Sequence, residues 1–516
     1  MTRFTRIMIC IAVILVAGAA VATFASPSGL AQAAASAPSG RPAAAGAKIT
    51  GAKTVVTFAW GGSLASQMPS LPIFRKYGMH ATYFVASGLV CQLSRVACQQ
   101  YSPYLTMPDI RKIAAYGDEI GGLSVLHQQL TTMPAAEAKR EICDDRSNLL
   151  RWGFRPIDFA YPFAAVDPTV EALTRQCGYN AGLGTGTLRG AGRCNKCAWA
   201  ESIPPKNPFN VRTPIEVNSV GTTWSVGTYE SIVKAAQRHG GGWVIFTIHD
   251  LCPTNCALGI TPSMLGQVLK WLHGQEKHNI VVETMRQVVG GPLRPAVGAP
   301  APRALPPPGV HNGNLAEATG NQPACFQEVD FGGTIASFTY HHSGGPHGLA
   351  TETLNITRPG SDNAKLLQVM DLGLCAPPVS SGHSYTTGIW YKSTCQAQIE
   401  IYRRTLTGSW VYWTTSPVFP ASTSWRQAAW TTPAVPTGTT ALSFGLTTNS
   451  VGTISTTEYS LELAKSYREL ILLGVLGFAI LAGGLIARGH YRYAKYTKAE
   501  AAIEAAANEE NATAIS

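Results

Sequence analysis

The sequence predicts an α/β domain, a (β/α) barrel, followed by an all-β jelly-roll sandwich and one transmembrane helix. Between 53 and 290, strand-like and helix-like patterns alternate, which is typical of a parallel sheet covered by helices. Between 311 and 463, short strand-type runs alternate with Gly, Pro, Ser and Thr, as in β-sandwiches. An uncharged apolar run over 470–487 is long enough to cross a bilayer.

Length and composition favour an exported protein of several domains. At 516 residues, the chain is long enough for two or three domains. Only 14% of the residues are charged, and the formal net charge of +10 favours anionic wall polymers or lipid headgroups as partners outside the cell. The sequence contains no arginine-rich helix or nucleic-acid-binding motif, so we expect no nucleic-acid partner.

Residues 1–35 are predicted to direct export, as a signal peptide or as an uncleaved signal anchor. Arg3 and Arg6 precede an apolar run over 7–24, which is the order found in export signals. The run is also long enough for an anchor, so both alternatives stay open. Residues 36–52 are rich in Ala, Pro, Gly and Ser and are predicted to form a flexible spacer.

In the barrel region, 53–290, apolar runs and the residues that begin or end helices predict the strands and helices. Strands are expected over 55–58, 81–86, 158–161, 243–249 and 280–283, with a further strand end at 119–122. Helices are expected over 71–77, 107–116, 134–152, 168–177, 229–239 and 262–273. Pro108 stands near the start of its helix, and Gly117, Gly153 and Gly178 follow helix ends, as helices prefer.

A Pro-rich stretch over 291–310 is predicted to be a stiff linker between the barrel and the sandwich. In the sandwich, 311–463, strands are expected over 388–392, 398–402, 410–413 and 441–445. Five tryptophans of this region have two interpretations, as a platform on which sugars stack or as filling of the core between two sheets. They are Trp390, Trp410, Trp413, Trp425 and Trp430.

The apolar run over 470–487 is predicted to be a membrane-spanning helix. Basic residues follow it at 488, 492, 495 and 498, which places the tail 488–516 in the cytoplasm and the bulk of the chain outside the cell. Small residues at 479, 483 and 487 have the small-xxx-small spacing with which two such helices could pair as a homodimer.

Twelve cysteines indicate an oxidising compartment. Their spacing suggests local disulfides between 91 and 98, 194 and 197, and 252 and 256, and longer ones between 143 and 177 and between 325 and 375. Cys395 would then be unpaired, and Cys194 with Cys197 could instead be half of a zinc site.

Four stretches of the barrel region end an apolar run in polar or turn residues: TFAWG at 57–61, LSVLH at 123–127, FAYPF at 159–163 and TIHD at 247–250. Their order and spacing resemble the active-site motifs of the NodB-type polysaccharide deacetylases. The resemblance implies a distorted (β/α) barrel that deacetylates sugars, with a divalent metal, commonly zinc, held by one aspartate and two histidines. It also implies an aspartate base and a histidine acid. The sandwich resembles galactose-binding-like carbohydrate-binding modules.

The first two stretches depart from the family pattern where the chemistry is most demanding. Ala59 stands at the position of the base, Trp60 at that of the metal aspartate, and Leu123 at that of the first metal histidine. His127 alone is retained as a remnant metal ligand, and one imidazole cannot hold a catalytic zinc, which needs three protein ligands. A zinc cofactor is therefore expected only if the site has been rebuilt.

The remaining stretches keep candidate functional residues. His249 matches the family's histidine acid, and Asp250 could orient it. Four residues are candidates for contact with substrate: Trp60, Tyr161, Pro162 and Phe163. Both histidines could also be ordinary polar residues at strand ends.

These observations predict an exported, single-pass membrane protein whose ligand is a cell-wall or extracellular polysaccharide and whose barrel is catalytically impaired. Two alternatives remain. One is an active hydrolase of non-peptide carbon–nitrogen bonds that deacetylates N-acetylated polysaccharide through a rebuilt site. The other is a non-catalytic surface protein that binds glycans through the sandwich.

Overall fold

The computed structural model describes residues 53–91, 102–190, 194–219, 223–254, 256–304, 309–330, 332–464, 483 and 485–502. The predicted export segment 1–35, the spacer 36–52 and most of the predicted membrane span 470–487 lie outside them. Within the described ranges, none of the helices combines the length and the apolar character needed to cross a bilayer.

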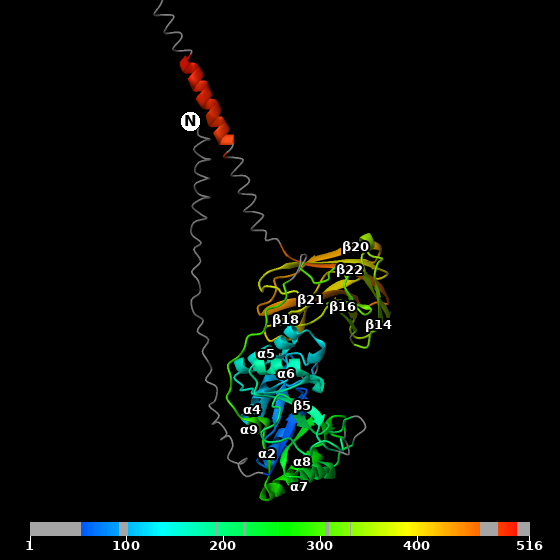
Figure 1. Ribbon diagram of the computed structural model, residues 1–516. Coiled ribbons are helices and arrows are strands. Elements are labelled where there is room, and N and C mark those ends of the chain that lie inside the picture. The colour runs from blue at the N-terminus through cyan, green and yellow to red at the C-terminus, as the bar shows by residue number, and fades with distance from the viewer. Residues whose placement is uncertain are drawn as a thin grey trace, which may run out of the picture. The chain divides into compact units, whose positions relative to one another are not determined.

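The first domain is a half-barrel of parallel strands with helices between them (Figure 1). Its strands are β1 (Thr54–Trp60), β2 (Thr82–Val85), β3 (Glu119–Gly122), β4 (Asp158–Ala160), β5 (Ala181–Thr187), β6 (Val211–Thr213), β7 (Gly242–Ile248) and β10 (Ile280–Val282). Its helices are α2 (Ser70–Lys76), α4 (Met107–Ala115), α5 (Ala135–Arg151), α6 (Pro168–Gln176), α7 (Val226–Arg238), α8 (Pro262–Gln275) and α9 (Met285–Val289). The predicted alternation of strands and helices is therefore confirmed.

The sheet runs in the order β10-β1-β2-β3-β4-β5-β6, and β7 also pairs with β1. The full-length pairing of β1 with β7 aligns Thr54 with Gly242 and Trp60 with Ile248, so both strands end at the same edge. Strands β5 and β6 were not predicted. Glycines in β5 are required by close contacts, because a Cβ added at Gly182 would lie 2.2 Å from the hydroxyl oxygen of Tyr161.

Helix starts follow the local sequence. Side chains of Thr106, Asp167, Ser225 and Thr261 each accept a hydrogen bond from an amide of the first turn of α4, α6, α7 and α8. These bonds satisfy amides that have no partner within the helix. The predicted helix boundaries agree with the observed ones to within a few residues.

The barrel has two apolar layers, because alternate residues of a strand point to opposite faces. Phe58 and Trp60 belong to the layer between the sheet and helices such as α2 and α8. Ala59 belongs to a separate cluster on the other face, together with residues of the neighbouring strands. This division decides which residues of β1 face the inside of the barrel.

The second domain is a sandwich of two five-stranded antiparallel sheets, in agreement with the predicted all-β fold (Figure 1). One sheet contains β13 (Phe326–Asp330), β16 (Ala364–Gln368), β21 (Thr439–Thr448), β18 (Gln398–Thr405) and β19 (Trp410–Thr415), in that order. The other contains β14 (Ile335–His341), β15 (Thr351–Arg358), β22 (Gly452–Leu463), β17 (Tyr385–Ser393) and β20 (Ser422–Thr431).

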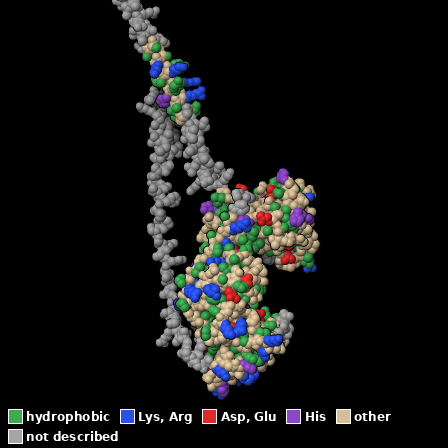
Figure 2. Space-filling view, viewed as in Figure 1, with side chains coloured by type: hydrophobic (Ala, Val, Ile, Leu, Met, Phe, Trp, Pro, Cys, Tyr) green, Lys and Arg blue, Asp and Glu red, His purple; other side chains and the backbone are tan. Residues whose placement is uncertain are grey.

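The five tryptophans of the sandwich are all half-buried. Trp413 and Trp430 pack against its core, which favours the core-filling interpretation for these two. Figure 2 shows basic and acidic side chains interspersed over the visible face of the barrel and the sandwich. That distribution agrees with a diffuse net charge.

Four of the predicted disulfides are present. They join Cys143 to Cys177, Cys194 to Cys197, Cys252 to Cys256, and Cys325 to Cys375. Cys91 is also disulfide-bonded, and its predicted partner at 98 lies outside the described residues. Cys395 is free and buried, as expected. The pairing of Cys194 with Cys197 disfavours the alternative of a half zinc site there.

Candidate functional site

Three strands place the candidate residues at one edge of the sheet. β1, β3 and β7 run in the same direction, and parallel strands display chemistry at their carboxyl ends. Gly61 follows β1, His127 lies five residues after the end of β3, and His249 directly follows β7. Phe163 lies three residues after β4, which pairs with β3.

His127 and His249 lie close enough to interact electrostatically. Burial, and then the charge of His249, lower the pKa of His127 to about 4. His127 is therefore neutral at pH 7. Its ring also contacts that of Phe163, with 5.0 Å between the ring centroids. The structure thus brings together His127, Phe163 and His249.

The partner of His249 is a carboxylate that sequence reasoning missed. The Nε2 atom of His249 lies 3.1 Å from Oε1 of Glu216, and both side chains are about a quarter exposed. Glu216 lies three residues after the end of β6. Because β6 was not recognised in the sequence, this strand-end carboxylate was not recognised either.

Asp250 was expected to orient His249, and Glu216 makes that contact instead. The Oδ1 atom of Asp250 is buried and has no hydrogen-bond partner. Asp250 opens the short strand β8 (Asp250–Leu251), which pairs with β9 (Gly259–Ile260). We therefore assign the orienting contact to Glu216.

The turn after β1 is shaped around the ring of His249. A Cβ added at Gly61 would lie 2.9 Å from Cε1 of His249, closer than real Cβ atoms approach, so any larger residue would require the ring to shift. The fully buried side chain of Gln67 donates hydrogen bonds to the backbone oxygens of Gly61 and His249, the latter at 2.8 Å. Gln67 therefore fixes the end of β1 to the end of β7.

The positions at which the family holds its base and its first metal histidine form an apolar cluster. Ala59 and Leu123 are 1% and 3% exposed, and both belong to the cluster inside the barrel, which also contains Ala160. Alkyl side chains offer neither a ligand atom nor a proton acceptor. The positions at which the base and that metal ligand are predicted to be lost are thus filled by packed apolar side chains.

Three of the four expectations about substrate contact are corrected by burial, at Trp60, Tyr161 and Pro162. Trp60 is 0% exposed and stacks on Tyr83, with 6.0 Å between ring centroids and 8° between ring planes. Tyr161 is 4% exposed, and its hydroxyl donates to the backbone oxygen of Phe209 at 2.6 Å. Neither side chain is accessible to a polysaccharide. Pro162 is also buried, whereas Phe163 is 67% exposed.

The backbone at this edge is held in uncommon conformations. Ser124, His127 and Phe163 have φ of 65°, 56° and 56°, and Ala164 and Leu258 also have positive φ. Such residues cost of order 1–3 kcal/mol each and cluster at functional sites. His249 is tied to one of them, because its amide donates to the oxygen of Leu258 at 2.7 Å.

The site residues do not fit a catalytic zinc held in the family's manner. Of the three expected ligand positions, only that of His127 carries an atom that can bind a metal. His249 is hydrogen-bonded to Glu216. Among the described residues, the one group suited to a metal by spacing is Asp250, Cys252 and Cys256, and its two sulfurs are joined in a disulfide. Glu119 begins β3 and so lies at the opposite edge of the sheet.

Comparison with known proteins identifies the domain. The polysaccharide deacetylase family model matches residues 50–182, about a quarter of the chain. Residues 50–182 form a polysaccharide deacetylase domain. No curated protein matches the chain.

Solved structures give weaker likenesses to parts of this chain. Peptidoglycan deacetylase PdaC from Bacillus subtilis is 18% identical, with 46% of this chain and 90% of that chain covered and a TM-score of 0.27. A family 4 carbohydrate esterase from Streptomyces lividans in complex with acetate is 16% identical, with coverages of 45% and 90% and a TM-score of 0.28. A CBM4 structure is 16% identical, with coverages of 30% and 99% and a TM-score of 0.23.

Proposed function

We propose that this chain is an exported, membrane-anchored member of the polysaccharide deacetylase family that binds cell-wall or extracellular glycan without metal-dependent hydrolysis. The observation that carries the proposal is the apolar cluster that contains Ala59 and Leu123, the residues at the family's positions for the base and the first metal histidine. General-base catalysis typically contributes about 10²–10⁴-fold in rate, and a metal adds several kcal/mol of charge stabilisation. A barrel without both retains little hydrolytic power.

The groups that remain suit binding. Phe163 presents an exposed ring on which the apolar face of a sugar can stack. Beside it, His127 and the His249–Glu216 pair offer donors and acceptors for hydroxyl or amide groups. An aromatic face with a few placed polar groups is the usual composition of a small-ligand site.

Binding and hydrolysis can be measured on the same sample. We expect the protein to bind a tetramer of N-acetylglucosamine while releasing no acetate from it in the presence of zinc. Phe163→Ala should weaken binding, and Phe163→Tyr, which keeps the ring, should retain it. Zinc-dependent acetate release that is lost in His127→Ala would refute the proposal.

One observation favours an alternative, deacetylation through a rebuilt site. The Glu216 carboxylate next to His249 could orient this imidazole and stabilise its charged form, as a carboxylate does for a catalytic histidine. This alternative predicts acetate release that falls by at least about 100-fold in Glu216→Gln. Equal background release from the parent and Glu216→Gln would exclude it.

The export and anchoring part of the proposal is supported by the disulfides and by the sequence. Four bridges among the described residues suit an oxidising compartment. The apolar run 470–487 would anchor the chain, with 488–516 inside the cell, and could pair two copies as a homodimer. Protease added to intact cells should remove the barrel and sandwich and leave a fragment containing the tail. A tail that is digested from outside would contradict this orientation.

A further inference from the structure

Helix α5 lies between the histidine site and the sandwich, and it makes specific contacts on both sides. Glu141 and Asp145, four residues apart, share one face of the helix. Glu137, Arg140 and Asn148 make contacts with the linker and the sandwich. All five side chains belong to residues that are buried.

On the barrel side, α5 holds the loop that carries His127. The amide of Leu123 donates to Oδ2 of Asp145 at 3.1 Å, and the amide of Leu126 donates to Oε2 of Glu141 at 2.8 Å. The amide of Val125 donates to the backbone oxygen of Glu141 at 3.1 Å. The loop between 123 and 127 is therefore fixed mainly by one helix.

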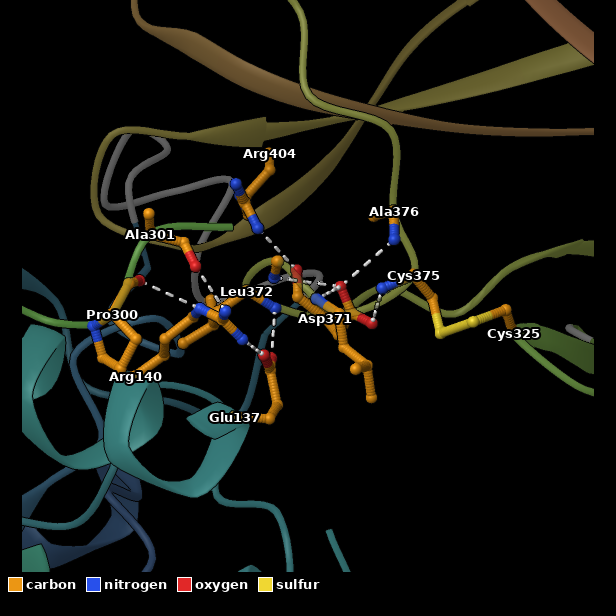
Figure 3. Close-up of polar contacts among 12 residues, drawn as sticks. Glu137, Arg140, Pro300, Ala301, Cys325, Asp371, Leu372, Cys375, Ala376 and Arg404 are labelled. Carbon is orange, nitrogen blue, oxygen red and sulfur yellow. Dashed lines mark hydrogen bonds and ion pairs between the residues drawn. A yellow bond between two sulfur atoms is a disulfide. The ribbon is translucent and has the colours of Figure 1, made fainter. Parts of the chain in front are cut away.

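On the sandwich side, the same helix holds a preorganised loop. The amide of Leu372 donates to Oε1 of Glu137 at 2.6 Å, and Glu137 also pairs with Arg140 (Figure 3). The carboxylate of Asp371 accepts from four amides of its own loop, including that of Cys375 at 2.7 Å. The loop is anchored further by the Cys325–Cys375 disulfide.

The linker is bound to the same helix. Arg140 donates to the backbone oxygens of Pro300 and Ala301 at 3.1 Å and 2.6 Å, and both contacts are drawn in Figure 3. Arg146 donates to those of Arg294 and Pro295 at 2.6 Å and 2.8 Å. The Pro-rich stretch was predicted to be a stiff linker, and these hydrogen bonds show that α5 binds it at 294–295 and 300–301.

A turn of the sandwich contacts the histidine loop directly. The turn between β18 and β19 presents Gly408, at which an added Cβ would lie 2.5 Å from Cγ1 of Val125 and 3.1 Å from Cδ2 of Leu372. The preceding Thr407 accepts from Nδ2 of Asn148 at 2.8 Å. Val125 is fully buried and stands two residues before His127.

We propose that the sandwich is a positioning element of the barrel's histidine site. Its turn at Thr407–Gly408 and its loop at 371–376 fix α5 and the loop 123–127, so that the conformation of His127 depends on the docked sandwich. Deletion or displacement of the sandwich would therefore change the site itself, beyond removing a second binding module. The proposal rests on the proposed glycan-binding function only where it concerns ligand affinity. The structural coupling between the sandwich and the loop 123–127 does not depend on a ligand.

The test is hydrogen exchange of the complete chain with its disulfides intact. Gly408→Ala adds the Cβ that collides with Val125, and it should speed exchange of the amides between 122 and 128 on the order of tenfold or more. Gly382→Ala is the matched control, because Gly382 has φ of 82° against 87° for Gly408, and its added Cβ meets nothing within 4 Å. The control should leave exchange at 122–128 unchanged.

A second substitution distinguishes coupling from general destabilisation. Val125→Ala removes the Cγ1 atom with which the new Cβ collides, so the double variant Gly408→Ala/Val125→Ala should recover slow exchange at 122–128. Unchanged exchange in Gly408→Ala, an equal effect of Gly382→Ala, or absence of rescue would each overturn the proposal.

If Gly408→Ala does not fold, Val125→Ala alone still tests the contact. It should speed exchange of the hydrogen-bonded amides of Thr405 and Gly408 in the sandwich turn, because coupling is reciprocal. Exchange that rises only within the barrel would contradict the proposal. Failure of N-acetylglucosamine tetramer to bind any variant, with these exchange effects intact, would refute the proposed function and leave the coupling standing.

Discussion

Replacing Trp60 by alanine is expected to destabilise the barrel strongly, because its indole lies inside the layer between the sheet and the helices. Trp60 is 0% exposed and stacks on Tyr83. A tryptophan buries roughly 200 Å², which at about 25 cal/mol per Å² corresponds to about 5 kcal/mol. Alanine keeps part of that area, so we expect the free energy of unfolding to fall by about 3–5 kcal/mol.

Trp60→Phe is the matched comparison. It keeps an aromatic ring against Tyr83 and removes the indole N–H, whose Nε1 is buried without a hydrogen-bond partner. We expect a loss of only about 1–2 kcal/mol. Urea unfolding followed by far-UV circular dichroism, with disulfides intact, measures both variants. Trp60→Ala within about 1 kcal/mol of the parent, together with lost glycan binding, would show that the indole faces substrate and that our assignment is wrong.

Three further predictions concern the histidine site. The folded-state pKa of His127 is lowered from 6.5 to about 4, so the unfolded chain binds a proton in this window that the folded chain does not. The contribution of neutral His127 to the free energy of unfolding is complete above pH 6.5 and declines toward pH 4, by about 2 kcal/mol at pH 5. Urea unfolding at pH 7 and at pH 5 should therefore show a smaller decline in His127→Gln than in the parent. Phe163→Ala should weaken tetramer binding roughly five- to tenfold by calorimetry, and unaltered affinity would remove Phe163 from the site. Gly61→Ala should displace the His249 ring, because the added Cβ would lie 2.9 Å from Cε1; an unchanged His249 imidazole NMR signal would contradict this contact.

Strands rich in β-branched and aromatic residues could be predicted from the sequence, and glycine-rich strands could not. β1 and β7 are nearly continuous apolar runs, as buried parallel strands are. β5, with the sequence AGLGTGT, has the composition of a turn. Its glycines make room for Tyr161 and Asn210, which are neighbours only in the folded chain.

The orientation of Trp60 was within reach of the sequence, because adjacent residues of a strand face opposite sides. With Ala59 inside the barrel, Trp60 has to face the helices, as observed. Glu216 was out of reach, since its place beside His249 depends on the pairing of β5 with β6. The docking of Gly408 on Val125 joins residues far apart in sequence, and no local pattern indicates it.

Zinc titration by calorimetry, on the complete chain with disulfides intact and on its His127→Ala variant, tests the central claim most directly. The account predicts that the two proteins give the same heats, because Ala59 and Leu123 leave His127 without partner ligands. Stoichiometric binding at or below about micromolar, equivalent to roughly −8 kcal/mol, that disappears in His127→Ala would contradict it. That result would mean that the barrel holds a rebuilt metal site, and acetate release from acetylated substrates would then decide whether it is an active deacetylase.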